Sequence, residues 1–192
     1  MFDNTVIYIC IFLLIVFACL LFFFAKRIIQ LKKISETDQM TLLLNYRGLL
    51  RKLEQLIKQK TPFTLAIIDI DNFRIFNAYS YKLGDEVLKE FASLLKRTFT
   101  EEVLIARFRL GDEFVIIFKN AELEKAKIKI NAFKETCGIH KFNSLNDCST
   151  HTISFSEGID ELKPEMNSID MLFSEAENSL KKNKSQKALA NN

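Results

Sequence analysis

The sequence predicts an α/β (α+β) domain, a split βαβ sheet of the ferredoxin-like or palm type, behind one N-terminal transmembrane helix. Two observations predict it. Residues 6–25 are an uncharged apolar run, and the rest of the chain alternates helical apolar periodicity with short β-branched runs. The expected order after the apolar run is helix, strand, helix, helix, strand, strand, helix, strand, helix. A split βαβ sheet with helices packed on one face is the economical way to bury these apolar surfaces.

The composition limits the class of protein. The chain has 192 residues, enough for one domain of ordinary size and an anchor. Its 48% hydrophobic and 27% charged residues exclude a disordered or low-complexity chain. The formal net charge of +3 is too small to indicate nucleic-acid binding, so no nucleic-acid partner is expected. The four cysteines are divided between the apolar run and the remainder, which is not the pattern of a disulfide framework.

The apolar run at 6–25 is long enough, as a helix of about 30 Å, to cross the hydrocarbon core of a bilayer. A cleaved signal peptide is the competing interpretation, but it carries positive charge before the run and small residues after it. Here Asp3 precedes the run, and the basic residues that follow it are Lys26, Arg27, Lys32 and Lys33. Because basic residues remain on the cytoplasmic side, the domain is expected to face the cytosol.

This topology gives the expected organisation of the whole chain. We expect a single-pass protein of the inner or plasma membrane, made of a short extracytoplasmic tail at 1–5, the transmembrane helix at 6–25, a juxtamembrane helical linker at 26–37 and a cytoplasmic domain at 38–192. We expect no extracytoplasmic sensor in a tail of five residues. Input would then come through the anchor or from a partner membrane protein.

The first elements of the domain follow from apolar spacing and from one proline. Leucine and isoleucine recur at helical spacing from Asn45 to about Lys60, which predicts an amphipathic helix. Pro62 ends it. The next run, FTLAIIDI at 63–70, is apolar and β-branched, as expected of a buried central strand.

The remaining elements are predicted in the same way. They are a short helix with Phe73 and Phe76, a turn at 80–84, a helix that includes Val87 to Leu95, strands at 103–109 and 113–118, a helix at 121–135, a polar loop at 136–149, a strand at 150–159 and a helix at 166–184. The connection between the second and third strands is very short, which predicts a hairpin.

Carboxylates gather at the ends of three of these strands. Asp69 and Asp71 lie at the end of the first strand, and Asp112 and Glu113 lie on the tip of the hairpin. Neighbouring strands would bring the four carboxylates together, and hard oxygen ligands of this kind hold Mg²⁺ beside nucleotide phosphates. Asp71 is also a candidate helix N-cap, and Asp112 a candidate turn residue. Asp69 follows a wholly apolar segment, so its carboxylate requires a partner or a metal.

Five segments carry motif-like patterns in order along the chain: DQMTLLLNYRGLLRKL at 38–53, IIDIDNFRIFN at 67–77, LGDEVLKEFA at 83–92, RLGDEFVIIF at 109–118 and FSEGI at 155–159. Together they resemble the motifs of the GGDEF family, the bacterial diguanylate cyclases. They are similar to the family's entry motif D-x-L-T-G-L-x-N-R-R, its D-x-D-x-F-K-x-I-N segment, its G-D-x-x-L helix, its signature hairpin and its late S-x-G strand. The resemblance covers about residues 38–187.

The resemblance implies condensation of two GTP molecules into cyclic di-GMP by a homodimer, with Mg²⁺ (or Mn²⁺) as cofactor. Each domain would present one GTP, and the 3′-hydroxyl of one nucleotide would attack the α-phosphate of the other. The roles that it implies are metal binding for Asp69 and for one or both of Asp112 and Glu113, deprotonation of the hydroxyl by the other hairpin carboxylate, guanine recognition by Asn77 and Asp85, further substrate contacts from Phe73, Arg74 and Gly111, and phosphate binding by Lys184. Lys184 lies in the run KKNK, for which a solvated helix end is the alternative.

The sequence departs from the family pattern mainly at residues that shape the backbone. Leu110 replaces the first glycine of the signature, giving LGDEF, and glycine there permits a tight turn close to the nucleotide. Either Arg107 is the family arginine with one extra residue after it, or Arg109 is and a glycine is missing. The other departures are Leu42, Ala78, a turn at 79–83 that is one residue short, Glu177, Lys181, no clear arginine after Lys184, and no inhibitory R-x-x-D motif before the hairpin.

These departures leave three hypotheses open. The first is a membrane-tethered diguanylate cyclase, because the metal-binding carboxylates remain. The second is a degenerate domain that binds a nucleotide or a protein as a receptor or scaffold. The third is a small membrane protein that uses the domain only to oligomerise.

A second constellation pairs both histidines with the two cysteines outside the apolar run. Cys137 precedes His140, and Cys148 precedes His151, each as Cys-x-x-His. Two such pairs could close a tetrahedral zinc site. The short spacer between them favours the alternative of two buried or idle thiols and two surface histidines.

Overall fold

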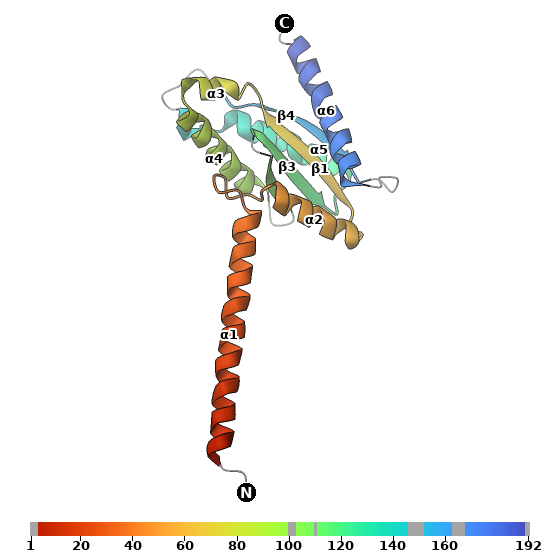
Figure 1. The fold of residues 1–192 in the computed structure, drawn as a ribbon. Helices are drawn as coiled ribbons and strands as arrows, with labels where there is room; N and C mark the ends of the chain where they lie inside the picture. The colour runs from red at the N-terminus through yellow and green to blue at the C-terminus, as the bar shows by residue number, and fades with distance from the viewer. Residues whose placement is uncertain (1–3, 100–102, 110, 146–151, 163–167, 191–192) are drawn as a thin grey trace. The chain divides into compact units, whose positions relative to one another are not determined.

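The computed structural model describes residues 4–99, 103–109, 111–145, 152–162 and 168–190. The chain divides into two compact units, Met1–Glu36 and Thr37–Asn192, which are described separately. The first unit contains the helix α1 (Asn4–Glu36), drawn in red in Figure 1. Within it, Val6–Leu31 is long and apolar enough to cross a membrane, and its large side chains are exposed. By length and composition this segment fits the expected anchor, and the helix continues without a break through the expected linker.

The second unit is built on one antiparallel sheet of four strands. They are β1 (Phe63–Ile70), β2 (Val103–Phe108), β3 (Glu113–Lys119) and β4 (Phe155–Glu161), in the order β2-β3-β1-β4. β1 and β3 are hydrogen-bonded neighbours, and β2 and β3 form the expected hairpin. The predicted α+β class and the adjacency of the first strand to the hairpin are therefore confirmed.

The last strand starts later than the sequence indicated. We expected it to begin at 150, but it begins at Phe155, which pairs with Ile70 at the end of β1. Because β1 stops there, the chain before Phe155 has no strand to pair with. One further backbone contact remains, in which the Asp71 amide donates to the carbonyl oxygen of Ser154 at 2.9 Å.

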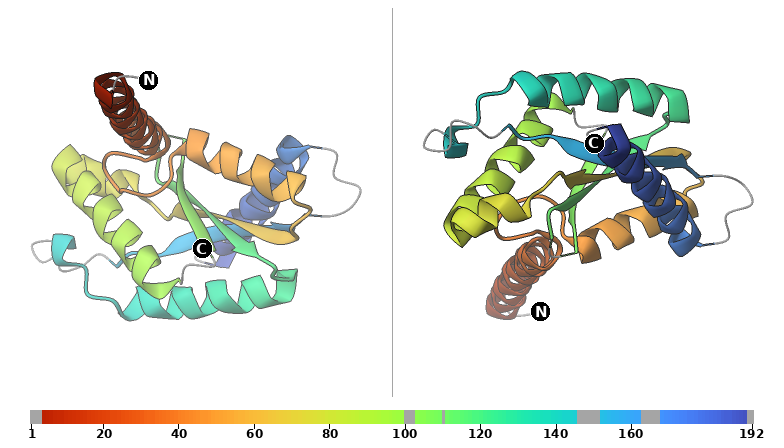
Figure 2. Two further views of the ribbon diagram at one scale, coloured as in Figure 1. Left: turned by 90° about the horizontal axis from the view of Figure 1, so that it is seen from below. Right: turned by 90° about the horizontal axis from the view of Figure 1, so that it is seen from above.

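Helices cover both faces of the sheet, which corrects the expectation of one covered face (Figure 2). α2 (Tyr46–Lys58) and α6 (Ile169–Ala190) pack on one face, and α4 (Tyr81–Thr98) and α5 (Leu123–Ile139) pack on the other. The reason lies in the composition of β1. Its alternate side chains point to opposite faces and all are apolar near its centre, so each face requires a cover. Leu65 and Ile67 pack in the core under α2 and α6, and Ala66 and Ile68 pack in the core under α4 and α5.

The ends of two helices also differ from the prediction. α5 runs to Ile139 rather than 135, and α6 runs to Ala190 rather than 184. A 3-10 turn, η1 (Asn143–Leu145), lies in the expected polar loop. The short helix α3 (Arg74–Tyr79) has Phe73 as its N-cap, and no side chain caps it. Asp71 is therefore not a helix cap.

Candidate functional site

Asp69 lies at the carboxyl end of β1, between the two neighbouring strands. It is directly opposite Glu113 of β3 and Ser156 of β4. Its Oδ1 is 2.6 Å from Nζ of Lys184 on α6. Burial raises the pKa of Asp69, Lys184 opposes the rise, and the charges of Asp112 and Asp71 add to it. The partner that the sequence required for this half-buried carboxylate is thus a lysine.

The two hairpin carboxylates lie beside Asp69. Burial raises the pKa of Glu113 as well, and the negative charges of Asp69 and Asp112 contribute in the same direction. Asp112 holds the turn against β1, because its carbonyl oxygen accepts from the amide of Ile70 at 3.4 Å. The sheet therefore crowds Asp69, Asp112 and Glu113 at one end, as the strand order predicted.

Asp71 is neither a helix cap nor free to bind a metal, because both of its carboxylate oxygens accept hydrogen bonds within the domain. Its Oδ1 accepts from the Ser156 hydroxyl and its Oδ2 from the Ser154 hydroxyl, each at 2.7 Å. Lys187 of α6 is ion-paired with Oδ2. Burial acts to raise the pKa of Asp71, but these three donors outweigh it and hold the pKa below its ordinary value. Asp71 is a strut between β1, β4 and α6.

The described ranges contain no group of three or more His, Cys, Asp or Glu side chains arranged to hold a metal ion. The chemistry of the donors nevertheless fits a divalent cation. Three carboxylates with hard oxygen atoms lie near one sheet end, and two of them have raised pKa values because they are partly buried and repel one another. A cation would relieve that repulsion, and Lys184 supplies part of the same compensation at Asp69.

A cavity of about 650 Å³ opens beside these carboxylates, a volume in the range of small-molecule sites. Its walls come from the end of β1, from the segment that leads into α3, from the hairpin and from α6. The lining includes Asp69, Asn72, Phe73, Arg74, Ile75, Asp112, Ser156 and Lys184. Five residues predicted for metal, substrate or phosphate contacts thus line one cavity: Asp69, Phe73, Arg74, Asp112 and Lys184.

The hairpin turn is supported by Arg107, whose side chain is buried. Its Nε donates to the carbonyl oxygen of Gly111 at 3.0 Å, and its Nη1 lies 3.5 Å from Oδ1 of Asp38. Arg109 instead is exposed, has a positive φ of 53° and pairs with Glu177 at 3.3 Å. Of the two candidate arginines, Arg107 is the one that is buried and hydrogen-bonded to the hairpin turn. Leu110 lies outside the described residues.

Asn77 and Asp85, the predicted guanine readers, lie on α3 and at the start of α4. Both are half-buried. The connection between the two helices is a single residue, Ser80, whose hydroxyl accepts from the Leu83 amide at 3.0 Å and caps α4. The Asn77 side chain lies against Gly84, the residue that precedes Asp85. Neither Asn77 nor Asp85 is among the residues that line the cavity.

The cysteine and histidine pairs form no site in the part of the chain that the structure describes. Cys137 is buried, its thiol donates to the carbonyl oxygen of Ile153 at 3.4 Å, and burial raises its pKa to about 12. His140 packs edge-on against Phe142, with Nε2 3.7 Å from Oε1 of Glu90. Cys148 and His151 lie outside the described residues.

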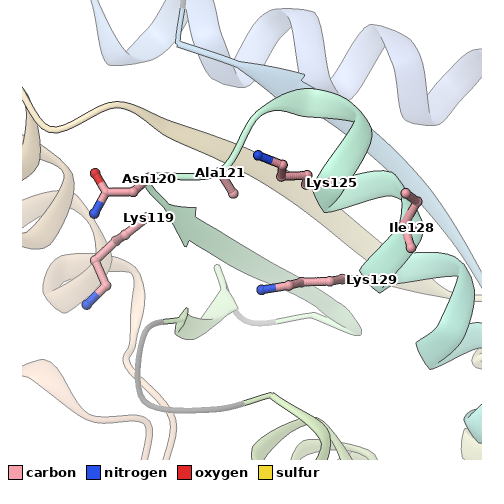
Figure 3. Close-up of a pocket in the computed structure, with 6 residues that line it drawn as sticks. All are labelled: Lys119, Asn120, Ala121, Lys125, Ile128 and Lys129. Carbon is pink, nitrogen blue, oxygen red and sulfur yellow. The ribbon is translucent and has the colours of Figure 1, made fainter.

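A second cavity, of about 570 Å³, lies at the opposite end of β3 (Figure 3). It is lined by Lys119, Asn120, Ala121, Lys125, Ile128 and Lys129. β3 begins at Glu113 and ends at Lys119, so this cavity is separated from the carboxylates by the length of the strand. No predicted site residue lines it.

Several residues of the site were not anticipated, namely Arg107 as a support, Ser154, Ser156 and Lys187. Ser154 and Ser156 are spaced by two residues, which in extended chain places both side chains on one side. That spacing is the signal that could have identified them.

Comparison with known proteins is consistent with this site. The family model described as diguanylate cyclase, GGDEF domain, matches residues 35–189. The chain is 36% identical over 99 residues to the response regulator PleD of Caulobacter vibrioides, covering 49% of this chain and 22% of PleD. It is 28% identical over 107 residues to the probable diguanylate cyclase DgcT of Escherichia coli, covering 54% of this chain and 24% of that protein.

A shorter match, 37% identical over 70 residues, joins 36% of this chain to 19% of an uncharacterized membrane protein of Staphylococcus aureus. The chain thus spans about a quarter or less of the length of these curated relatives.

Solved structures share the fold. The coiled coil and GGDEF domain of DgcB from Caulobacter crescentus, solved in complex with c-di-GMP, superposes with a TM-score of 0.76 at 23% identity, covering 88% of this chain and 91% of that one. The GGDEF domain of FimX from Pseudomonas aeruginosa gives a TM-score of 0.69 at 21% identity, with 79% and 94% covered. At these identities the likeness shows the fold alone.

Proposed function

The chain belongs to the diguanylate cyclase GGDEF-domain family, and from that premise we propose that it condenses two GTP molecules into cyclic di-GMP at the membrane. The observation that carries the proposal is the position of Asp69. It lies opposite Glu113, within reach of Lys184, on the wall of a cavity of about 650 Å³. Crowded carboxylates beside a basic side chain suit a triphosphate and its counter-ion.

The substrate contacts in this proposal follow the walls of the cavity. Lys184 and Arg74 place positive charge where a triphosphate would lie, and Phe73 lines the space beside it. Gly111 would contact the substrate from the hairpin turn, next to Asp112. Asp85 would accept from the ring N–H and amino group of guanine, and Asn77 would complete the recognition of its edge. Asp69 and one or both of Asp112 and Glu113 would hold Mg²⁺ or Mn²⁺, which when bound neutralises phosphate charge and orients the reacting oxygens.

The chemistry requires a base and a second active site. A hairpin carboxylate accepts the proton of the 3′-hydroxyl of the GTP presented by the partner copy. The 3′-oxygen forms a bond to the α-phosphorus as the bond from that phosphorus to the bridging oxygen breaks, and pyrophosphate leaves. The raised pKa of Glu113 suits it for the proton transfer, since a more basic carboxylate holds the proton better. Two such transfers close the cyclic product, so we propose a homodimer.

We propose that α1 anchors the domain as a single pass in the inner or plasma membrane, with the domain in the cytoplasm. The apolar span and the basic residues that follow it support this topology. Input through the anchor, or from a partner membrane protein, is part of the same proposal.

The second candidate is a domain that binds a nucleotide without turnover, as a receptor or scaffold. One observation favours it. Lys184 is paired with Asp69 and no three carboxylates of the described residues are arranged as a metal-holding group, so the site has to rearrange before it is loaded. Loss of the glycine at 110 from the signature supports the same alternative.

One experiment decides between the two candidates. The full chain in detergent micelles, at high protein concentration, is incubated with GTP and Mg²⁺, and cyclic di-GMP and pyrophosphate are measured. We expect both products for the native chain and neither for Asp69→Asn. GTP binding in calorimetry without any product would refute the cyclase and establish the receptor. Failure to bind guanine nucleotides would refute both.

A further inference from the structure

Gly84 lies in the first turn of α4, where its own backbone gives no reason for a glycine. The described part of the chain has no glycine with positive φ, and the Gly84 amide makes an ordinary helical bond of 3.2 Å to the carbonyl oxygen of Ser80. Glycine in a helix is less favourable than alanine because it has more backbone freedom to lose on folding. Some neighbour must therefore occupy the space that a side chain would take.

That neighbour is the carboxamide of Asn77. A Cβ atom placed on Gly84 would overlap Oδ1 of Asn77, would lie 3.1 Å from its Cγ and would lie 3.3 Å from Cζ of Phe73. The other glycines mark the contrast. At Gly158 a Cβ would collide with backbone atoms of α6, including the carbonyl oxygen of Ala176, and at Gly138 it would meet nothing within 4 Å. Of these three glycines, Gly84 is the one at which the end of a polar side chain occupies the space of the missing Cβ.

The nature of the neighbour determines the consequence of filling the space. A collision with backbone separates two elements and destabilises the fold, whereas the end of an asparagine can rotate away. Phe73 connects this point to the cavity, because it lines the cavity and also lies against the position of the missing Cβ. A side chain at 84 would therefore displace the amide at the edge of the site and leave the packing of α4 largely unchanged.

We propose that Gly84 is a specificity-determining positioning residue, whose missing side chain provides the place from which the Asn77 carboxamide recognises guanine beside Asp85. The inference rests on the proposed function for the identity of the base. It adds that selectivity for guanine over adenine depends on a glycine that touches no ligand. The two adjacent residues then have complementary roles: Gly84 leaves room for the Asn77 carboxamide, and Asp85 supplies the carboxylate.

The test compares Gly84→Ala with Gly138→Ala in the full chain in detergent micelles, with GTP and ATP as probes. Both changes replace a helical glycine with alanine, so both are expected to leave the melting temperature unchanged or raise it. We expect the native chain and Gly138→Ala to prefer GTP, and Gly84→Ala to lose about five- to tenfold of that preference, the worth of one displaced hydrogen-bonding group. A preference retained in Gly84→Ala would overturn the inference and leave the proposed function standing.

Two further measurements separate positioning from general damage. Asn77→Ala should abolish the effect of Gly84→Ala, so that the double variant is no less selective than Asn77→Ala alone; additive losses would overturn the inference. In ligand-free protein, the side-chain amide resonance of Asn77 should shift in Gly84→Ala and not in Gly138→Ala. An unshifted resonance would also overturn it. Equal affinity of the native chain for GTP and ATP would refute the proposed function and this inference together.

Discussion

Arg107 donates from Nε to the carbonyl oxygen of Gly111 at 3.0 Å, so a buried guanidinium supports the turn that carries Asp112 and Glu113. Its Nη1 reaches Asp38, which also accepts from the amide and hydroxyl of Thr41 at 2.8 and 2.7 Å. Asp38 lies two residues after the end of α1. A continuous set of contacts within the domain therefore joins its first residues to the hairpin of the site.

We predict that Arg107→Met destabilises the domain by about 2–4 kcal/mol, because it leaves the Asp38 carboxylate partly buried and without its cation. Burial acts to raise the pKa of Asp38, while Thr41 and Arg107 together hold it below its ordinary value. Chemical denaturation of the full chain in micelles measures the loss. The control is Arg109→Gln, whose exposed pair with Glu177 should contribute less than about 0.5 kcal/mol. Equal losses in the two variants would contradict the assignment of Arg107 as the support.

Ser156 and Ser154 make hydrogen bonds of the same length to Asp71 but differ in burial. Ser156 is 3% exposed, whereas Ser154 is exposed. We predict that Ser156→Ala lowers the free energy of unfolding by about 1–2 kcal/mol, since water cannot replace the lost donor, and that Ser154→Ala costs less than about 0.5 kcal/mol. Thermal denaturation of the two variants side by side tests this. Similar losses would show that Asp71 is solvated and is not a strut.

The crowded carboxylates give a pH dependence of defined sign. The pKa of Glu113 is raised, mainly by burial and then by Asp69 and Asp112, so between its ordinary pKa of 4.5 and its higher folded value the folded state holds more protons than the unfolded chain. Stability from this group therefore falls as pH rises through that window. We predict that Glu113→Gln raises the melting temperature by about 1–4 °C at pH 7 and has no effect below about pH 4.

The measurement is a pair of melting curves over pH for the native chain and Glu113→Gln. Asp71 provides the opposite sign within the same site. Its folded pKa is lowered, so its contribution is present above the ordinary pKa of 3.8 and is lost as pH falls through the folded value. A destabilising effect of Glu113→Gln at neutral pH would mean that Glu113 is compensated by a partner and is not strained by its neighbours.

The features that could be predicted from the sequence are those that depend on residues close together along the chain. The strand order and the pairing of Asp69 with the hairpin followed from local periodicity and from the short connection at 109–112. Asp71 could not be understood locally, because its serine partners lie 83 and 85 residues away. Arg107 is likewise 69 residues from Asp38, and two candidate arginines looked equivalent until burial separated them. For the lysines at the end of α6, the sequence left phosphate binding and a solvated helix end as alternatives. It gave no sign that Lys184 and Lys187 pair with Asp69 and Asp71.

The different parts assigned to Asp69 and Asp71 lead to the most direct test of the metal site. Both carboxylates are partly buried and both pair with a lysine of α6, but only Asp69 has a raised pKa, and a cation would relieve the repulsion that contributes to it. Asp71 is already satisfied by two hydroxyls and Lys187, so a cation has little to offer it. We predict that Mg²⁺ alone, at about ten times its dissociation constant, stabilises the native chain by about 1.4 kcal/mol, or about 3–6 °C in melting temperature.

Asp69→Asn should abolish this response to Mg²⁺, and its starting melting temperature should fall little, because the raised pKa of Asp69 marks its charge as unfavourable in the fold. Asp71→Asn should do the reverse. It should lower the starting melting temperature, since the lowered pKa marks its charge as favourable, and keep the full response to Mg²⁺. Melting curves of the three proteins with and without Mg²⁺ make the comparison. Loss of the response in Asp71→Asn alone would move the metal to Asp71 and would require its serine and lysine contacts to open on binding.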